Sequence, residues 1–237
     1  MIINRLETLF GEPHTLENGI NIYSPLLRDI VRAKELNYMI HLSFCSFNKK
    51  KILVDMFNLS PEEFEQFGNE DDYTSLIKIV SVVPYIEEAL SFFVREQVDF
   101  KEETFFVNGR EFVNKDNYKF VSKIIYELNG VFVEEQKEMK FKNNRTKEAY
   151  EEFIKLQKKH KKKEDGLELK EIVSILICSE GNGITHFNMG DLTIYQAYEQ
   201  FERLSMKENY RTIVPLWANG HLKEGERPPE WKTKIKF

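Results

Sequence analysis

The segment from Glu180 to Trp217 constrains the fold most, because its pattern predicts a turn followed by a capped amphipathic helix. Two glycines flank Asn182, and these residue types tolerate positive φ, which favours a turn. Thr193 and Gln196 have the spacing of a capping box that begins a helix. Apolar residues then recur at helical spacing, at Ile194, Ala197, Tyr198, Phe201 and Leu204, with Glu199, Glu202 and Arg203 on the other side. The segment contains no reactive constellation, so it specifies structure and no chemistry.

Composition indicates a folded, acidic protein. The 237 residues are 41% hydrophobic and 31% charged, a balance typical of folded chains rather than disordered ones. This length is sufficient for one large domain or two small ones. The formal net charge is −5, so the overall field does not favour nucleic acid or an anionic membrane. Cys45 and Cys178 both lie in apolar, helix-like surroundings, and we expect two buried free thiols.

The sequence predicts no membrane span and no secretion signal. The longest apolar-rich segment is interrupted by Lys78 and Ser81 and ends at Pro84, far short of the length that crosses a bilayer. The first fifteen residues lack a basic region followed by an apolar one. We therefore expect a cytosolic protein.

Turn and cap signals predict helices interrupted by two hairpins. Asn18-Gly19 and Asn108-Gly109 are two-residue turns typical of hairpins over residues 12–23 and 104–113. Two helices are predicted to begin at Ser24-Pro25 and at Ser60-Pro61. Two more span residues 72–82 and 85–96 on either side of Pro84. A further helix begins at a cap on Asn114 and ends at Asn129-Gly130, and the last two before the closing helix span residues 146–163 and 169–178.

The predicted fold class is therefore mainly α-helical (α+β), a helical domain with two small β-hairpins. We divide the chain into an N-terminal region of hairpins and helices at residues 1–140 and a C-terminal helical region at residues 141–222. The polar residues 223–237 contain Pro228-Pro229, which predicts an extended, mobile tail.

No residue is predicted to be catalytic, to bind a cofactor or to ligate a metal ion. The five histidines stand at no ligand spacing from one another or from cysteine, and the structural interpretation of His41 and His186 is favoured. Adjacent acids such as Glu62-Glu63 are typical of a solvated surface. Lysines crowd residues Lys155 to Lys163, where a solvated helix end is favoured over a site for nucleic-acid phosphates. The prediction is that the protein is not an enzyme.

Two stretches together resemble a known group of proteins. GINIYSPLLRDIVRAKELNYMIHLSF, with Pro25, Ile30 and Tyr38, resembles a segment of tail-gene proteins from phages of low-GC Gram-positive hosts. FNMGDLTIYQAYEQFERLSMKENY is similar to the closing helix of such proteins and of tail assembly chaperones in long-tailed phages. The usual acidic residue of the first stretch is matched only by Glu35, and the closing tryptophan region diverges.

The resemblance implies a non-enzymatic role in the cytoplasm of the infected host cell. Such chaperones bind the tape-measure protein, keep its apolar helices soluble and help to recruit tail-tube subunits. A structural component that stays in the virion, in the tail or baseplate, is the leading alternative, and a nucleic-acid-associated protein is a second. Association with further copies of the chain stays open.

The closing helix is predicted to contribute to a partner surface as well as to the core. Tyr195, Tyr198 and Phe201 are the candidate partner-binding residues, because a tyrosine with one apolar face and one polar tip suits an interface. A second interpretation is equally open, in which both tyrosines belong to the core with their hydroxyls at the rim. We expect replacement of Phe201 to damage folding and replacement of Tyr195 to weaken association only.

Overall fold

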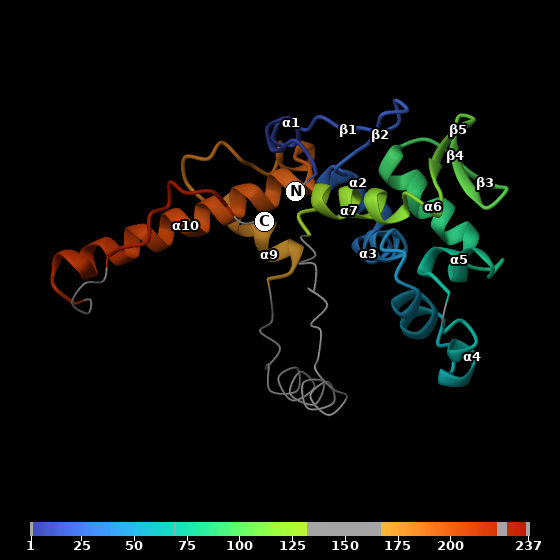
Figure 1. The fold of residues 1–237 in the computed structure, drawn as a ribbon. Coiled ribbons are helices and arrows are strands. Elements are labelled where there is room, and N and C mark those ends of the chain that lie inside the picture. The colour runs from blue at the N-terminus through green and yellow to red at the C-terminus, as the bar shows by residue number, and fades with distance from the viewer. Residues whose placement is uncertain (1, 69, 132–166, 222–226, 236–237) are drawn as a thin grey trace.

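The computed structural model describes residues 2–68, 70–131, 167–221 and 227–235 (Figure 1). The helical elements are α1 (Arg5–Leu9), α2 (Leu27–Ala33), α3 (Glu35–Phe44), the π-helical η1 (Lys50–Met56), α4 (Pro61–Glu65), α5 (Asp72–Ile77), α6 (Val83–Val94), α7 (Tyr118–Leu128), α9 (Leu169–Cys178), the 3₁₀ turn η2 (Met189–Asp191) and α10 (Ile194–Ala218). The strands are β1 (His14–Thr15), β2 (Asn21–Ile22), β3 (Val98–Lys101), β4 (Thr104–Val107) and β5 (Arg110–Val113). This mainly helical arrangement with two small antiparallel sheets confirms the predicted fold class.

The first hairpin is confirmed, but the helix predicted after it begins later. β1 and β2 pair antiparallel around a turn in which Gly19 has φ +78°. Ser24-Pro25 was expected to start a helix, whereas α2 begins at Leu27. The intervening residues stay extended because they pair with a distant segment, where the Leu27 amide donates to the Leu192 carbonyl at 2.9 Å. A tertiary contact therefore overrides the local start signal.

The second hairpin is also confirmed, and the structure adds a strand to it. β4 and β5 are the predicted strands, and β3 pairs with β4 to complete a three-stranded sheet. The β3–β4 turn is made by Glu102 and Glu103, both with positive φ, at 48° and 58°. Glutamate rarely adopts this conformation, so the turn carries no sequence signal of the kind that Asn-Gly provides.

Several predicted helix boundaries need correction. Helical spacing predicts one apolar stripe from Leu27 to Cys45, but Lys34 has φ +70° and divides this segment into α2 and α3. Val31, which belongs to that stripe, is 76% exposed. Pro84 lies in the first turn of α6 instead of separating two helices, a position where its missing N–H is not needed. The N-cap position of α7 is Asn117, not Asn114, and its side chain makes no capping hydrogen bond. Helical spacing places Phe120 on the apolar face of this segment, but its side chain is exposed. The closing signal at Asn129-Gly130 is confirmed.

An aromatic cluster forms the centre of the N-terminal part of the core. The rings of Phe47, Tyr73, Phe105 and Tyr118 contact one another with centroid separations between 5.4 and 6.5 Å. The Tyr73 hydroxyl donates to the Glu103 carbonyl at 2.8 Å, so its polar tip is satisfied. Buried residues from Ile3 to Ala197 belong to one continuous cluster, which joins the start of α10 to this core.

Some predictions fall outside the described residues or change within them. The helix expected at residues 146–163 lies outside the described residues, and the division at residue 140 stays a prediction. Cys45 is a buried free thiol as expected, and burial raises its pKa. Cys178 is a free thiol but is exposed, because it ends α9 on the side away from the core. Within the described part of the chain, no helix is long and apolar enough to cross a membrane.

Candidate functional site

The candidate site is the surface of α10 beyond its buried first turn, together with the segments beside it. Backbone hydrogen bonds to the segment after β2 fix the beginning of this helix. The Ile194 amide donates to the Pro25 carbonyl at 2.9 Å, and the Tyr195 amide donates to the Ser24 hydroxyl at 3.3 Å. Ser24 therefore helps to satisfy the first turn of α10 rather than the first turn of α2.

The predicted capping box of α10 is confirmed. The Thr193 hydroxyl accepts from the Gln196 amide at 3.2 Å, and Gln196 Oε1 accepts from the Thr193 amide at 2.8 Å. Gln196 Nε2 also donates to the Leu9 carbonyl at 2.8 Å, which ties the end of α1 to the start of α10. These contacts anchor the first turn of α10 to α1 and to the segment after β2.

Tyr195, the first candidate partner-binding residue, lies in the core. Its side chain is 1% exposed, and Arg5 Nε donates to its hydroxyl at 3.3 Å. Tyr195 therefore agrees with the second interpretation, in which the tyrosine belongs to the core and its hydroxyl lies at the rim. Tyr195 lines the bottom of a hollow beside α1 but has almost no exposed area, so the expectation that it adds aromatic area beyond the core needs correction.

Tyr198 and Phe201 are half-buried and pack against the edge of the core. The Tyr198 ring covers Gly130, where an added Cβ would lie 2.8 Å from Tyr198 Cδ2. Burial, and then the nearby Glu35 carboxylate, raise the pKa of the Tyr198 hydroxyl, so it is neutral at physiological pH. Both side chains retain exposed area, and their role in partner binding stays a prediction.

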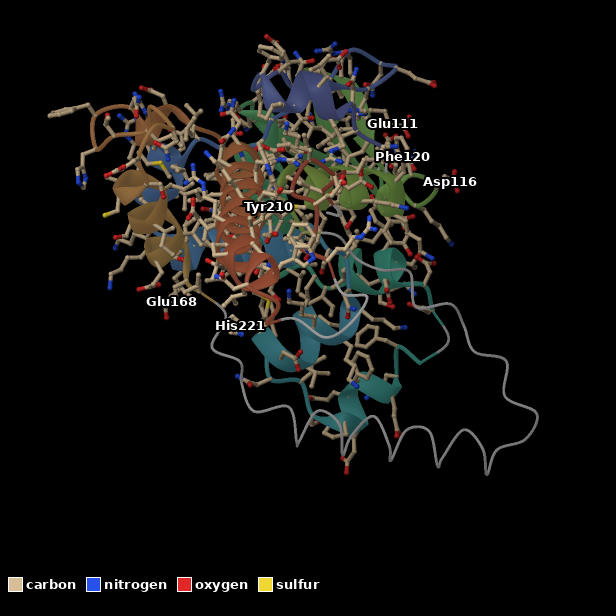
Figure 2. All side chains as sticks on the ribbon, turned by 90° about the vertical axis from the view of Figure 1, so that its left-hand side faces the viewer. Glu111, Asp116, Phe120, Glu168, Tyr210 and His221 are labelled. Carbon is tan, nitrogen blue, oxygen red and sulfur yellow. The ribbon has the colours of Figure 1, made fainter. Side chains whose placement is uncertain are left out.

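The remainder of α10 extends away from the body of the protein (Figure 1). Its buried residues are confined to the first turn, at Ile194, Tyr195 and Ala197. Near its end, Leu216 is 44% exposed and Trp217 is 49% exposed. Figure 2 looks toward this end, with Tyr210 on the helix and His221 just beyond it. A helix of this length spans about 37 Å, so it presents an apolar end well outside the core.

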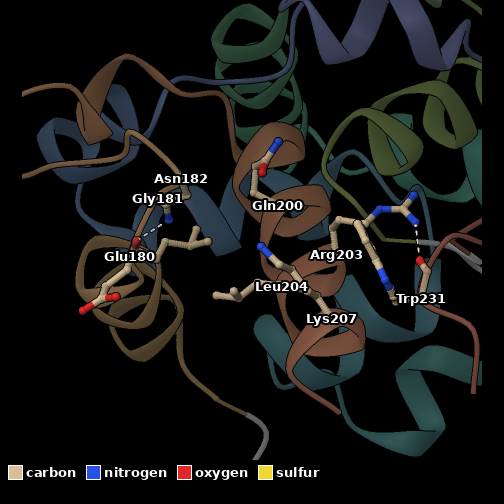
Figure 3. A pocket seen from close by; sticks show the side chains of 9 residues that line it. Glu180, Gly181, Asn182, Gln200, Arg203, Leu204, Lys207 and Trp231 are labelled. Carbon is tan, nitrogen blue, oxygen red and sulfur yellow. Dashed lines mark hydrogen bonds between the residues drawn. The ribbon is translucent and has the colours of Figure 1, made fainter. Parts of the chain in front are cut away.

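Two hollows lie beside α10. One, of about 370 Å³, is lined by α1 and by the chain's C-terminal residues, with Leu6 and Leu9 as its apolar wall. The other, of about 210 Å³, lies between α10 and the turn at Glu180–Asn182. Figure 3 shows Gln200, Leu204 and Lys207 of α10 facing that turn. Both hollows are lined by charged and apolar side chains. The smaller lies below the range of roughly 300–1,000 Å³ that is typical of small-molecule pockets, and the larger lies at its lower end.

The described part of the tail, residues 227–235, lies against α10 and α1. Arg203 Nη1 donates to the carbonyl oxygens of Trp231 and Thr233, at 2.9 and 2.8 Å (Figure 3 shows the first contact). Arg5 Nη1 donates to the Ile235 carbonyl at 3.1 Å, and the Ile235 side chain is buried. The tail bends at residues 231–233, so the extended conformation predicted for it is wrong there. The sequence pattern assigned Arg203 to the solvent side of the closing helix, so it did not predict this docking. The mobility of the tail stays a prediction.

The described residues provide no clear arrangement for metal binding. Among them, no group of three or more His, Cys, Asp or Glu side chains is placed to hold a metal ion. His41 stacks on Phe92 with a centroid separation of 5.2 Å, and burial lowers its pKa, with Glu88 acting in the opposite direction. His186 is exposed. The Lys155–Lys163 run lies outside the described residues, so the structure does not bear on its predicted role.

Comparison with known proteins places the chain near a prophage product. A family described as the YomV second domain matches residues 158–236, which include α9, α10 and the tail. The chain is 25% identical over 216 residues to the SPbeta prophage-derived uncharacterized protein YomV of Bacillus subtilis (strain 168), covering 87% of this chain and 81% of the relative. No solved structure matches the chain significantly. These similarities support a phage-related origin, and the relative's name states no role in tail assembly.

Proposed function

We propose that this protein is a non-enzymatic phage tail assembly chaperone that binds apolar helices of the tape-measure protein in the host cytoplasm. The observation that carries the proposal is the apolar end of α10, where Leu216 and Trp217 are about half exposed beyond the core. Apolar side chains held on a projecting helix suit contact with the apolar face of a partner helix. The similarity to a prophage-derived protein supports the phage context.

The fixed base of α10 suits a chaperone, because it holds the free end of the helix in position for a partner. The capping box and the contacts to Ser24, Pro25 and Leu9 fix its base, so the free end keeps its orientation when a partner binds. Preorganisation of this kind lowers the entropy lost on association. The tail-tube subunits that the resemblance implies would then be recruited to the assembled complex.

Co-expression tests the proposal. The tape-measure protein encoded in the same phage genome is expressed alone and with this chain, and its soluble fraction is measured after lysis. We expect the soluble fraction to rise with this chain present and the two proteins to purify together. Equal insolubility in both cases would contradict the proposal. Detection of the chain in purified virions at stoichiometric amounts would favour the structural alternative in the tail or baseplate.

The absence of enzymatic activity is part of the proposal and has its own test. Purified protein is assayed for hydrolysis of nucleotides, phosphoesters and carboxylic esters, and we expect background rates. Turnover that a single substitution of an Asp or His abolishes would contradict it. Binding of DNA that falls steeply with salt and is lost when Lys158 to Lys163 are replaced by Gln would favour the nucleic-acid alternative.

A further inference from the structure

The tail docks on the third turn of α10 through its backbone. Arg203 Nη1 donates to the carbonyl oxygens of Trp231 and Thr233, at 2.9 and 2.8 Å. The chain bends at residues 231–233, and both oxygens meet the same guanidinium at this bend. Hydrogen bonds from a charged donor are stronger than those between neutral groups. The bend is therefore a defined contact with the helix.

The end of the described tail joins the same helix to α1. Arg5 Nη1 donates to the Ile235 carbonyl at 3.1 Å, and Arg5 Nε donates to the Tyr195 hydroxyl at 3.3 Å. The Ile235 side chain is 5% exposed, so its burial adds an apolar anchor. One arginine of α1 therefore contacts both the first turn of α10 and the tail. Through this contact and the one at the bend, the tail links the first turn of the helix to the third.

The tail lies against a face of α10 that the sequence leaves polar. Helical spacing places Glu199 and Arg203 on the solvent side, yet the Glu199 side chain is 13% exposed and lies 3.7 Å from the guanidinium (Oε1 to Nη2). Both side chains line the same hollow as Leu6 of α1 and Thr233 of the tail. Since α9 also packs on α10, the middle of the helix is held by two elements. Figure 3 shows α10 between Trp231 and the turn that follows α9.

The outer turns of α10 depend on such support, because their sequence is a poor helix former. Between Ala197 and the end of the helix, a stretch that the structure describes throughout, no residue is buried. Thr212, Ile213 and Val214 are β-branched, and they precede Pro215, which lacks the N–H that a helix interior uses. Helix formation is cooperative, so a weak segment stays helical where it continues from a turn that is already fixed.

We propose that residues 227–235 are a clasp, which extends the fixed part of α10 from its first turn to Arg203. The outer part of α10 keeps its helical conformation only while the clasp is closed. The match to the YomV second domain spans α9, α10 and the tail, so the three belong to one sequence unit. An open clasp leaves the core in place and frees the end that carries Leu216 and Trp217. This proposal does not depend on the tail assembly role.

Amide hydrogen exchange of the full chain, followed by NMR, tests the clasp. Ile235→Asp places a charge at the buried anchor and opens the clasp. We expect the amides of residues 201–214 to exchange at least about 10-fold faster than in the unaltered chain, whereas the amides of α7 keep their rates. Thr233→Asp is the matched control, because it adds the same charge at an exposed position of the tail, and it should change these rates less than about twofold.

A second pair of variants opens the clasp from the helix. Glu199→Gln/Arg203→Met removes the donor to the tail without leaving an unpaired carboxylate, and should accelerate exchange over the same residues. Glu208→Gln/Arg211→Met removes a surface ion pair of the same helix, with N and O 2.8 Å apart, that does not contact the tail. This control should change the rates by no more than about twofold.

Three results would overturn the proposal. The first is unchanged exchange of residues 201–214 with both Ile235→Asp and the Arg203 variant, since the helix would then hold without the clasp. The second is equal acceleration by Ile235→Asp and Thr233→Asp, since burial of the anchor would then not matter. The third is equal acceleration in α7, because the tail would then be part of the common core and not a clasp on α10.

Discussion

Aromatic side chains between α3 and α7 have surroundings opposite to those of the aromatic side chain near the free end of α10. Phe47, Tyr73 and Phe105 are at most 1% exposed and pack ring against ring. Trp217 is 49% exposed on a turn of α10 that contains no buried residue. The first group stabilises the fold, whereas the second contributes little to it. The position of an aromatic residue in the fold therefore decides whether it stabilises the core or is a candidate for partner recognition.

The largest expected effect lies in the buried group. Phe105→Ala removes a ring that contacts Phe100, with centroids 4.7 Å apart, and Tyr73. We expect the free energy of unfolding to fall by about 3–5 kcal/mol, since a large cavity opens in the core. Urea denaturation measures this loss. A decrease below about 1 kcal/mol would contradict the claim that the buried aromatic group stabilises the fold.

A second pair of substitutions examines the boundary between the two regions on α10 itself. Tyr195 is 1% exposed and Phe201 is half-buried, so Tyr195→Ala should cost about 3 kcal/mol and Phe201→Ala about 1–2 kcal/mol. This order reverses the one expected from the sequence. Thermal and urea denaturation of both variants check it. A larger loss for Phe201→Ala would show that the buried part of α10 extends further than described.

The contact between α10 and the end of α7 is tested at Gly130. This glycine has φ +69°, and an added Cβ would meet Tyr198 Cδ2 at 2.8 Å. Gly109 has φ +74° with nothing within 4 Å, so it is a matched control for the conformational strain alone. We expect Gly109→Ala to cost about 1 kcal/mol and Gly130→Ala about 1 kcal/mol more from the clash.

The double variant Gly130→Ala/Tyr198→Ala isolates the contact between these two residues. Removing the Tyr198 ring should restore most of the unfolding free energy that the clash costs, while the strain of positive φ at position 130 remains. The losses from the two single substitutions should therefore not add in the double variant. Additive losses of unfolding free energy would mean that Tyr198 does not pack on Gly130 in solution.

Local signals predicted the elements that depend on local chemistry. The turns at Gly19 and Gly109, the capping box at Thr193 and the bounds of α9 all follow from residue types at short spacing. Ser24-Pro25 failed as a helix start because its backbone pairs with residues about 170 positions away. The turn at Glu102 was missed because glutamate with positive φ is rare.

The candidate site was predictable only in part. The apolar spacing of the closing helix indicated its packing face, but periodicity does not reveal where along that face the core ends. Ala197 and Phe201 lie on the same predicted face, yet the first is buried and the second half-buried, because α10 leaves the body between them. Tyr195 lies outside that predicted face and is nevertheless buried. The docking of the tail on Arg203 depends on backbone carbonyls, which every sequence has. No pattern of side chains identifies such a contact.

The measurement that tests the central claim most directly replaces Trp217 by Ser in the full chain. It records both the free energy of unfolding and co-purification with the tape-measure protein of the same phage genome. Phe187→Ser is the matched control, since Phe187 is a 97% exposed aromatic residue in the loop before η2. We predict that Trp217→Ser changes the free energy of unfolding by less than about 0.5 kcal/mol and reduces co-purification at least about 10-fold, with Phe187→Ser changing neither. Co-purification that survives Trp217→Ser would contradict the claim that the free end of α10 is the recognition surface.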